Sequence, residues 1–258
     1  MLIMRGLITI LFSFVFLLSS VPADAKFKII GIETGFYVTL SGYIVTNAHV
    51  VAKCQDIYAI DHSEGKIWSY KQFNNNKLEL INIDHYQDLV VLRDPKKRYG
   101  HDIPDFLKDY NPEKGEKVYV IGFPGESGSS GKYKFKESVI TNVKGPTGEA
   151  HQISFEHAGM PGNSGGPLLD AWGNIIGVVS AKKYKNVIYR ETGDLEGKHV
   201  SDVAVNLDTL IEFLNNNRVF VRSTTTSRSR SKYNKESPSE IKAQTAKYIT
   251  RIFCTRDK

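Results

Sequence analysis

Apolar residues are grouped in short runs along most of the chain, and turn residues separate these runs. In the first part, Tyr43–Thr46, Asp56–Ile60 and Leu89–Leu92 are rich in β-branched and aromatic residues, and polar or glycine-containing segments lie between them. A second set of similar runs follows between about residues 116 and 205. Many short strands at this spacing predict an all-β fold, either an antiparallel barrel or a sandwich.

Two β-rich blocks are therefore expected, with a polar linker between them. The first block covers about residues 26–95, the linker covers 94–115, and the second block covers about 116–205. Next come four apolar residues at the spacing of one helical face, namely Leu207, Leu210, Ile211 and Leu214. They predict a short amphipathic helix over 207–217, at the end of a globular region that stops near residue 222.

The N-terminal stretch has the pattern of a secretory signal peptide. Arg5 precedes a twelve-residue apolar run, and the segment ends in Ala23-Asp24-Ala25. The run is short for a membrane span, although an uncleaved anchor stays an alternative. We expect cleavage after Ala25 and an exported protein that works in the periplasm or outside the cell.

The chain is basic mainly through its last segment. Ten of the 34 Lys and Arg residues, but only three of the 28 Asp and Glu residues, lie from Arg222 onward. The polar residues from Ser223 predict a disordered tail. Within it, Ser237-Pro238-Ser239-Glu240 predicts a capped amphipathic helix over 238–253. A basic tail would suit an anionic surface, such as a membrane, or a partner, whereas nucleic acid is a poor fit for an exported protein.

Two cysteines, Cys54 and Cys254, are too few for a disulfide framework. In an oxidising compartment they could pair with each other. We favour instead a small buried hydrophobe at Cys54, because it follows an apolar turn. The histidines lie at no recognised zinc-ligand spacing from these cysteines, and we expect no metal or organic cofactor.

Three local motifs carry the candidate chemistry. His49 lies in TNAHVV, Asp88 begins DLVVL, and Ser164 lies in the glycine-rich run GNSGGP. A serine hydroxyl becomes a good nucleophile when an imidazole takes its proton and a carboxylate orients that imidazole. Each residue alone has an ordinary structural interpretation. Together, in these local contexts, they predict a catalytic triad.

The run around Ser164 also fits the G-x-S-x-G elbow of α/β-hydrolases. That fold needs a helix directly after the serine and the chain order serine, acid, histidine. Here two glycines and a proline follow Ser164, and the His49 and Asp88 motifs precede it. The elbow interpretation is therefore the weaker one.

These motifs, together with EKGEKVYVIGFPGE and VAVNLDTLIEFL, make the chain resemble a chymotrypsin-fold (trypsin-like) serine protease, and most closely the HtrA/Deg-type protease domain. The resemblance spans about residues 31–217. It implies two six-stranded antiparallel β-barrels with the active site in the cleft between them. We expect no PDZ domain of the kind found in full HtrA/Deg proteins, because the basic tail follows Leu214 in the place of such a domain.

The resemblance also implies further site residues. The backbone amides of Gly162 and Ser164, with Asn163 close by, would form the oxyanion hole. An extended substrate would pair with the strand that contains Val179, Ser180, Ala181 and Lys182. The pocket floor would lie near Ala158, and the absence of an acid there predicts a small or medium apolar residue before the scissile bond.

Activation by a newly cut N-terminus is not expected. In trypsin-like zymogens the new terminus pairs with an aspartate just before the nucleophile, and here that position holds the uncharged Asn163. We therefore predict activity without cleavage at Lys28.

The sequence as a whole predicts a secreted or periplasmic serine endopeptidase that acts on proteins or peptides. The alternative is a catalytically silent member of the same fold that binds extended peptides as a chaperone or adaptor. The intact His49, Asp88 and Ser164 motifs favour the enzyme.

Overall fold

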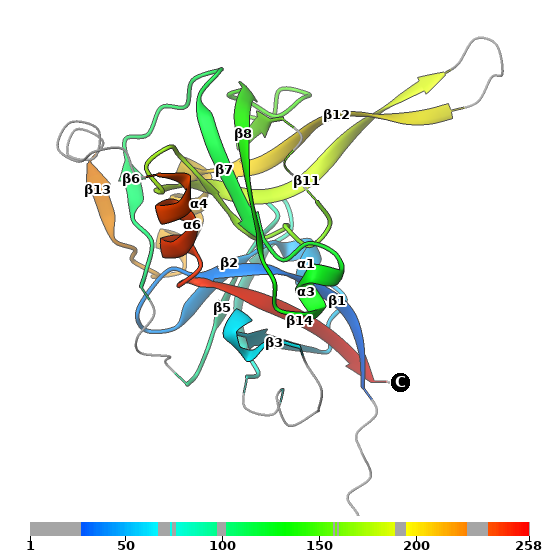
Figure 1. Cartoon of the computed structure of the whole chain (residues 1–258), viewed down its shortest axis with the longest axis vertical. Coiled ribbons are helices and arrows are strands. Elements are labelled where there is room, and N and C mark those ends of the chain that lie inside the picture. Colours follow the sequence, from blue (N-terminus) through cyan, green and yellow to red (C-terminus); the bar gives the residue numbers. More distant parts are fainter. Residues whose placement is uncertain are drawn as a thin grey trace, which may run out of the picture.

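A computed structural model describes residues 27–66, 73, 76–96, 102–156, 158, 160–188, 195–225 and 237–257 (Figure 1). The expected signal peptide lies outside these residues. In the first part of the chain the elements are β1 (Phe27–Tyr37), β2 (Tyr43–Thr46), α1 (Ala48–Val51), β3 (Asp56–Ile60), η1 (His62–Glu64), β4 (Glu79–Asp84), β5 (Leu89–Arg93) and β6 (Phe106–Lys108). The others are β7 (Lys117–Gly122), α3 (Glu126–Ser129), β8 (Lys134–Asn142), β9 (Gln152–Phe155), β10 (Pro167–Leu169), β11 (Ile175–Ile188), β12 (Leu195–Asn206), α4 (Leu207–Asn216), β13 (Ser223–Thr225), α6 (Pro238–Thr245) and β14 (Ile249–Asp257).

The first sheet has six strands in the order β3-β14-β1-β2-β5-β4. A bridge between Tyr58 and Lys77 joins β3 to the segment that leads into β4. This bridge links the two ends of the sheet, so that the sheet forms a barrel. Five strands come from the N-terminal part of the chain, and the sixth, β14, comes from its C-terminal segment. The expected strand at 66–70 lies, apart from Lys66, outside the described residues.

The second sheet has the order β10-β7-β8-β9-β12-β11-β6-β13, and β10 also pairs with β11. That extra pairing closes six of the strands, β7 to β12, into a ring. The expected architecture of two six-stranded β-barrels is therefore confirmed. The linker prediction is wrong at residues 106–108, because β6 pairs in parallel with β11 and with β13.

Helix α4 confirms the expected amphipathic helix at the end of the second barrel. The side chain of Asn206 caps it by accepting a hydrogen bond from the Thr209 amide at 3.0 Å. Its apolar face is buried through Leu207, Leu210 and Leu214. Before this helix, β11 and β12 pair along their length and extend from the body as a twisted ribbon (Figure 1).

The C-terminal segment corrects the tail prediction. The capping box at Ser237 and Glu240 is present, as expected, but helix α6 ends at Thr245. Residues Ile249–Asp257 then form β14, which lies between β1 and β3 in the first barrel. Seven consecutive residues of this strand are buried. The run ITRIFCT is rich in β-branched and aromatic side chains, which favour a strand with sheet neighbours on both sides over a helix.

One basic residue of this segment is an internal structural cation. Arg251 is fully buried, and its guanidinium donates hydrogen bonds to the carbonyl oxygens of Ile60, Asp61 and Gly128. Burial lowers the pKa of Arg251, and the charges of Glu64 and Asp61 partly offset that effect. The prediction of a disordered basic tail is therefore wrong for residues 223–225, which form β13, and for residues 237–257.

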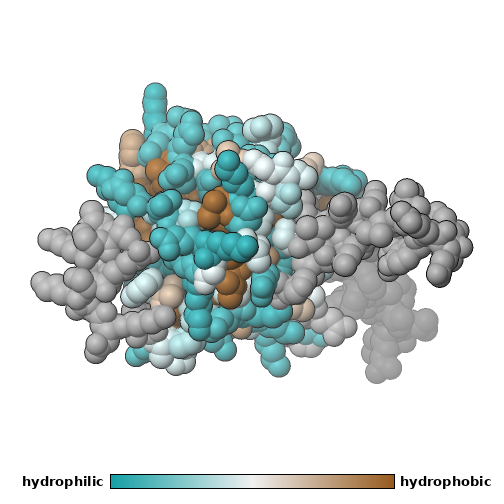
Figure 2. All heavy atoms as spheres, turned by 90° about the horizontal axis from the view of Figure 1, so that it is seen from above, coloured by the Kyte–Doolittle hydropathy of each residue, from teal (hydrophilic) through white to brown (hydrophobic). Residues whose placement is uncertain are grey.

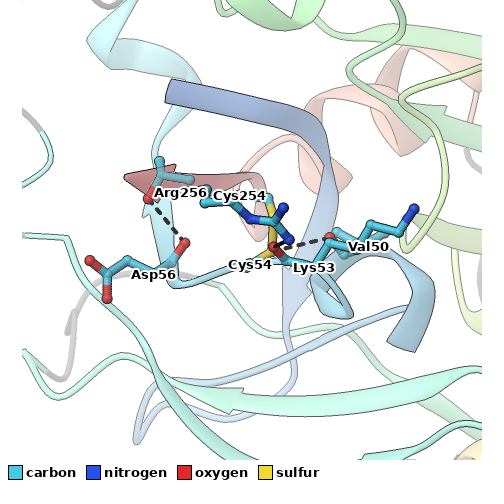
Figure 3. The surroundings of a disulfide bond; sticks show 7 residues. Val50, Lys53, Cys54, Asp56, Cys254 and Arg256 are labelled. Carbon is cyan, nitrogen blue, oxygen red and sulfur yellow. Dashed lines mark hydrogen bonds between the residues drawn. A yellow bond between two sulfur atoms is a disulfide. The ribbon is translucent and has the colours of Figure 1, made fainter. Parts of the chain in front are cut away.

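A disulfide joins Cys54 to Cys254 across a sequence separation of 200 residues (Figure 3). Their Cα atoms are 5.0 Å apart because β14 pairs with β3, which begins just after Cys54. The nearby Arg256 side chain donates a hydrogen bond to the Lys53 carbonyl oxygen at 3.0 Å. The preference for an unpaired Cys54 is therefore wrong. The pairing depends on where β14 inserts, which the sequence pattern did not reveal.

The face of the molecule seen in Figure 2 is largely hydrophilic, with small apolar patches separated by polar side chains. In the part of the chain that the structure describes, no helix is long and apolar enough to cross a membrane.

Candidate active site

His49 projects from α1, a single helical turn that directly follows β2. The other residues of that turn, Ala48, Val50 and Val51, are buried and fix it against the first barrel. The His49 side chain points the other way and is 48% exposed. The side chain of Asn47, just before the turn, donates a hydrogen bond to the Asp88 carbonyl oxygen at 2.9 Å. This contact joins α1 to the second motif.

Asp88 lies at the end of a tight turn that Asp84 stabilises. The Asp84 carboxylate accepts hydrogen bonds from the amides of Tyr86 and Gln87 at 2.8 and 2.9 Å. Asp88 itself has a left-handed backbone, with φ 57°, directly before the buried strand β5. A non-glycine residue in this region is uncommon and indicates a conformation that the surroundings enforce.

The structure brings His49 and Asp88 together. The distances from His49 Nδ1 to the two Asp88 carboxylate oxygens are 2.8 and 2.9 Å, and the His49 backbone amide donates to Oδ1 at 3.0 Å. The hydrogen bond to Asp88 raises the pKa of His49, and burial of the imidazole offsets part of that rise. Burial works against ionisation of Asp88, but the hydrogen bonds from His49 and Ser180 outweigh it, so the pKa of Asp88 is lowered.

Ser180 has a role that the sequence interpretation missed. It was expected only as part of the substrate-binding strand, but its hydroxyl donates a hydrogen bond to Asp88 Oδ2 at 2.6 Å. Ser180 is buried on β11, in the second barrel, whereas Asp88 directly precedes β5 of the first barrel. The contact therefore ties the two barrels together at the site. The serine-alanine pair in VVSA gave no local signal for this role.

The Ser164 loop lies between β1 and β11. The Thr34 amide on β1 donates to the Ser164 carbonyl oxygen at 3.1 Å, and the Gly165 amide donates to the Val179 carbonyl oxygen at 2.8 Å. Because Ser180 directly follows Val179, the same stretch of β11 contacts both the Ser164 loop and Asp88. In the hydrogen bonds of the described residues none joins Ser164 Oγ to His49. Such catalytic contacts are often long in a free enzyme and tighten when substrate binds.

Gly162 and Gly165 permit the shape of this loop. Their φ angles are 97° and 80°, in the left-handed region that favours glycine. A Cβ at position 162 would collide with the Phe123 carbonyl, and one at position 165 would collide with the Thr46 side chain. The glycines flanking Ser164 are therefore explained by the backbone path.

The three expected oxyanion-hole amides differ in the groups that they interact with in this structure. The Gly162 amide acts on the Glu33 carboxyl group and lowers the pKa of that group. The Asn163 amide donates to the Met160 carbonyl oxygen at 2.9 Å, so it is not available to a substrate in this conformation. The Ser164 amide has no hydrogen-bond acceptor within the described part of the chain.

Glu33 is a second residue that the sequence interpretation missed. Burial raises its pKa to about 7, and the positive charge of His49 and the Gly162 amide only partly oppose that rise. In turn, the negative charge of Glu33 contributes to the raised pKa of His49. A carboxyl group is therefore coupled electrostatically to the candidate base and to a candidate oxyanion donor. Its position inside an ordinary strand, β1, made it inconspicuous in the sequence.

Part of the backbone of the expected substrate-binding strand already pairs with other segments of the fold. The Val179 amide donates to the Gly166 carbonyl oxygen at 2.8 Å, and β12 pairs with one edge of β11 at Ala181 and Lys182. On the other edge, the backbone from Ser180 to Lys182 has no strand partner among the described residues. Ala158 is fully buried, and its carbonyl oxygen accepts a hydrogen bond from the Asn163 side chain at 3.3 Å.

The described residues hold no group of three or more His, Cys, Asp or Glu side chains that could ligate a metal ion. The groups that the site brings together are an imidazole paired with a carboxylate, a nearby serine, and backbone amides.

Comparison with known families gives one match over a large part of the chain. A family model described as a trypsin-like peptidase domain matches residues 33–178, more than half of the sequence. Those residues include His49, Asp88 and Ser164.

Curated relatives include bacterial proteases. A probable periplasmic serine endoprotease DegP-like of Hahella chejuensis is 28% identical over 191 residues, which cover 70% of this chain and 34% of that protein. A protein of the same name from Chlamydia muridarum is 32% identical over 159 residues, which cover 57% of this chain and 28% of that protein. The chain spans about a quarter to a third of the length of such relatives.

Solved structures support the fold. The serine endoprotease from Yersinia pestis aligns with a TM-score of 0.51 at 18% identity, over 73% of this chain and 58% of that chain. The HtrA-type protease AlgW with decapeptide aligns with a TM-score of 0.52 at 22% identity, over 72% and 51% of the two chains. With its two barrels and the family match over residues 33–178, this chain belongs to the trypsin-like peptidase family, and its similarities are to proteases of the HtrA and DegP type.

Proposed function

We propose that this chain is a serine endopeptidase in which Ser164 is the nucleophile, His49 the general base and Asp88 the residue that orients His49. The observation that carries the proposal is the contact of His49 Nδ1 with both oxygens of Asp88, at 2.8 and 2.9 Å. Because Nδ1–H donates a hydrogen bond to Asp88, the unprotonated Nε2 of the imidazole can accept the serine proton.

The proposed reaction has two balanced halves. Ser164 Oγ attacks the substrate carbonyl carbon while its proton passes to His49 Nε2, and the carbonyl oxygen becomes an oxyanion. The amides of Gly162 and Ser164 stabilise that oxyanion. When the intermediate collapses, the amine leaves with the proton from His49. Water then attacks the acyl-enzyme by the same route, which releases the acid and restores Ser164.

The proposed substrates are proteins or peptides in an extended conformation. The open edge of β11 from Ser180 to Lys182 can pair with a substrate backbone, as an added strand does. A solved structure with the same fold is that of the HtrA-type protease AlgW with decapeptide. The small, buried Ala158 supports a preference for a small or medium apolar residue before the scissile bond.

Activity is proposed to need no cleavage at Lys28. Lys28 pairs with Arg256 of β14, so this stretch is already a strand of the first barrel. Asn163 is buried, and its side-chain amide donates to Ala158 rather than to a terminal group. A Lys28→Gln variant should therefore be as active as the unaltered protein, whereas dependence on a cut at this site would contradict the proposal.

We further propose export to the periplasm or the cell exterior. The disulfide between Cys54 and Cys254 supports it, because such bonds persist in oxidising compartments. Relatives in other bacteria are named periplasmic serine endoproteases. N-terminal sequencing of the protein from a periplasmic extract should start at Lys26, and a cytoplasmic, uncleaved product would contradict this.

We also propose that the basic C-terminal segment contacts an anionic surface. Arg251 cannot take part in that contact, because it is buried in the fold. Removal of everything after Arg222 would also remove β14, so truncation cannot test it. Replacing Arg228, Arg230, Lys232 and Lys235 by glutamine in the full chain keeps β14. That variant should lose salt-dependent binding to anionic vesicles, and unchanged binding would contradict the contact.

The alternative function is a catalytically silent peptide binder on the same fold. Cleavage of an unfolded model protein such as casein separates the two functions. The unaltered protein and an exposed-site control, Ser41→Ala, should cleave casein, and Ser164→Ala should not. Binding of casein without any cleavage by the folded protein would favour the binder.

A further inference from the structure

The Glu33 carboxyl group lies at the candidate oxyanion hole. Its neighbour on β1, Thr34, is hydrogen bonded to the active-site loop twice: its amide donates to the Ser164 carbonyl oxygen, and its hydroxyl donates to the Gly162 carbonyl oxygen at 2.6 Å. The Gly162 amide acts on the Glu33 carboxyl group and lowers its pKa, against the effect of burial. The carboxyl group therefore lies near one of the two amides that a substrate oxyanion needs.

The second carboxyl oxygen of Glu33, Oε2, is buried and has no hydrogen-bond partner. The charged group that acts on Glu33 is His49, from α1. On the neighbouring strand β14, the Arg251 guanidinium turns away and donates to carbonyl oxygens at Ile60, Asp61 and Gly128. No Lys or Arg of the described chain forms an ion pair with Glu33, so Oε2 is a buried acceptor without a donor.

Glu33 lies on β1, next to Thr34, which bonds the Ser164 loop. The Ser164 loop is bonded to β11 on one side, through Gly165 and Val179, and to β1 on the other side, through Thr34. In the proposed function the segment before the scissile bond runs along β11. The segment after the scissile bond then passes over β1, where Glu33 is the acidic side chain.

We propose that Glu33 is a specificity-determining residue that selects peptides with Lys or Arg at the first or second position after the scissile bond. The inference rests on the proposed endopeptidase function. A cationic side chain gives the buried Oε2 its missing donors and draws the carboxyl group away from the Gly162 amide, which becomes free for the oxyanion. A neutral peptide leaves the carboxyl group in place, where it competes for that amide and repels the developing negative charge.

The ionisation of Glu33 fits this role. Burial raises its pKa to about 7, so the carboxyl group is predominantly charged above that pH and predominantly neutral below it. The groups facing it are His49 and the Gly162 amide, with Asp88 behind His49. Preference for a basic residue should therefore be strong at pH 8 and weak at pH 6.

Internally quenched peptides that differ only after the scissile bond test the proposal. Each has an apolar residue before that bond and Lys, Gln or Glu at the first or the second position after it. At pH 8 the unaltered enzyme should show kcat/KM at least about ten-fold higher for Lys than for Gln at one of these positions, as expected for a charge-assisted contact. Glu should be the poorest of the three.

In Glu33→Gln the Lys and Gln peptides should be cleaved at rates within about two-fold of each other, since the variant keeps the side-chain shape but not the charge. Glu79→Gln, at an exposed position on β4, is the matched control and should keep the preference. Glu33→Lys provides a second variant, and it should favour the Glu peptide over the Lys peptide.

Equal cleavage of Lys and Gln peptides by the unaltered enzyme, or an undiminished preference in folded Glu33→Gln, would overturn the role of Glu33 and leave the proposed function standing. Failure to cleave any peptide, with no labelling of Ser164 by a fluorophosphonate, would overturn the proposed function and this inference with it.

Discussion

The Ser180 hydroxyl donates a 2.6 Å hydrogen bond to the Asp88 carboxylate, and so joins the second barrel to the acid of the first. Asp88 thus receives hydrogen bonds from His49 on one side and from Ser180 on the other. A partly buried carboxylate held in this way keeps its charge and its orientation toward the imidazole. The fold places the acid through contacts that lie far apart in the sequence.

Replacing Ser180 by alanine should lower kcat/KM by about ten-fold, equivalent to about 1.4 kcal/mol of transition-state stabilisation. The loss of one hydrogen bond to the charged carboxylate should raise the pKa of Asp88 and loosen its hold on His49. Steady-state kinetics on a quenched peptide measure this effect. Ser138→Ala is the control, because that buried hydroxyl bonds to the Glu156 carbonyl oxygen, away from Asp88. Equal losses in both variants would contradict a specific role for Ser180.

As the pH decreases, kcat/KM should fall, and the midpoint of this acidic limb should lie above the ordinary pKa of histidine. Asp88 and Glu33 both raise the pKa of His49, so the imidazole stays protonated to higher pH, and the neutral form that acts as base appears only as the pH rises through that pKa. Glu33→Gln removes one of these negative charges, so the limb should move to lower pH. A limb that stays in place or moves to higher pH would contradict the coupling of Glu33 with His49.

Loss of the Cys54–Cys254 disulfide should lower the free energy of unfolding by about 2–5 kcal/mol, because the bond closes a very long loop in the unfolded chain. Urea unfolding of the unaltered protein, with and without reductant, measures the difference. A Cys54→Ala/Cys254→Ala double variant should match the reduced protein and be insensitive to reductant. Identical midpoints for the oxidised and reduced protein would count against this bond as a stabilising link.

Removal of residues 237–258 should prevent folding of the first barrel. The deletion takes away β14, exposes the strand edges of β1 and β3, and leaves the apolar neighbours of Ile252 and Phe253 without cover. Circular dichroism and limited proteolysis of the truncated protein test this. Truncation at residue 236 that left a stable, protease-resistant and active domain would contradict the assignment of β14 to the barrel.

The local alternation of strand-forming runs and turn residues, as in Tyr43–Thr46 and Leu89–Leu92, predicted an all-β fold. The resemblance to chymotrypsin-fold proteases implied the two six-stranded barrels. The sequence also predicted α4 and the cap at Ser237, which depend on residues a few positions apart. It did not predict that residues 249–257 pair with β1 and β3. That pairing is a tertiary choice between distant segments, and the basic composition around it favoured disorder.

In the site, too, the features set by local sequence were predicted and those set by tertiary contacts were not. The motifs of His49, Asp88 and Ser164 are local and were recognisable, and the structure brings His49 and Asp88 into contact. Ser180 and Glu33 lie inside ordinary strands, and only the packing of the two barrels gives them their positions beside Asp88 and Gly162. Side chains that act through tertiary contacts leave no pattern in a single sequence.

The most direct test of the account is the reactivity of Ser164 toward a fluorophosphonate probe, read by mass spectrometry of the labelled peptide. We expect one phosphonylated residue, Ser164, labelled in the folded protein but not after denaturation in urea. Labelling should be lost in Ser164→Ala, strongly slowed in His49→Ala and Asp88→Asn, and unchanged in Ser41→Ala. A folded, oxidised protein that takes up no label, or takes it up at another serine, would contradict the catalytic assignment.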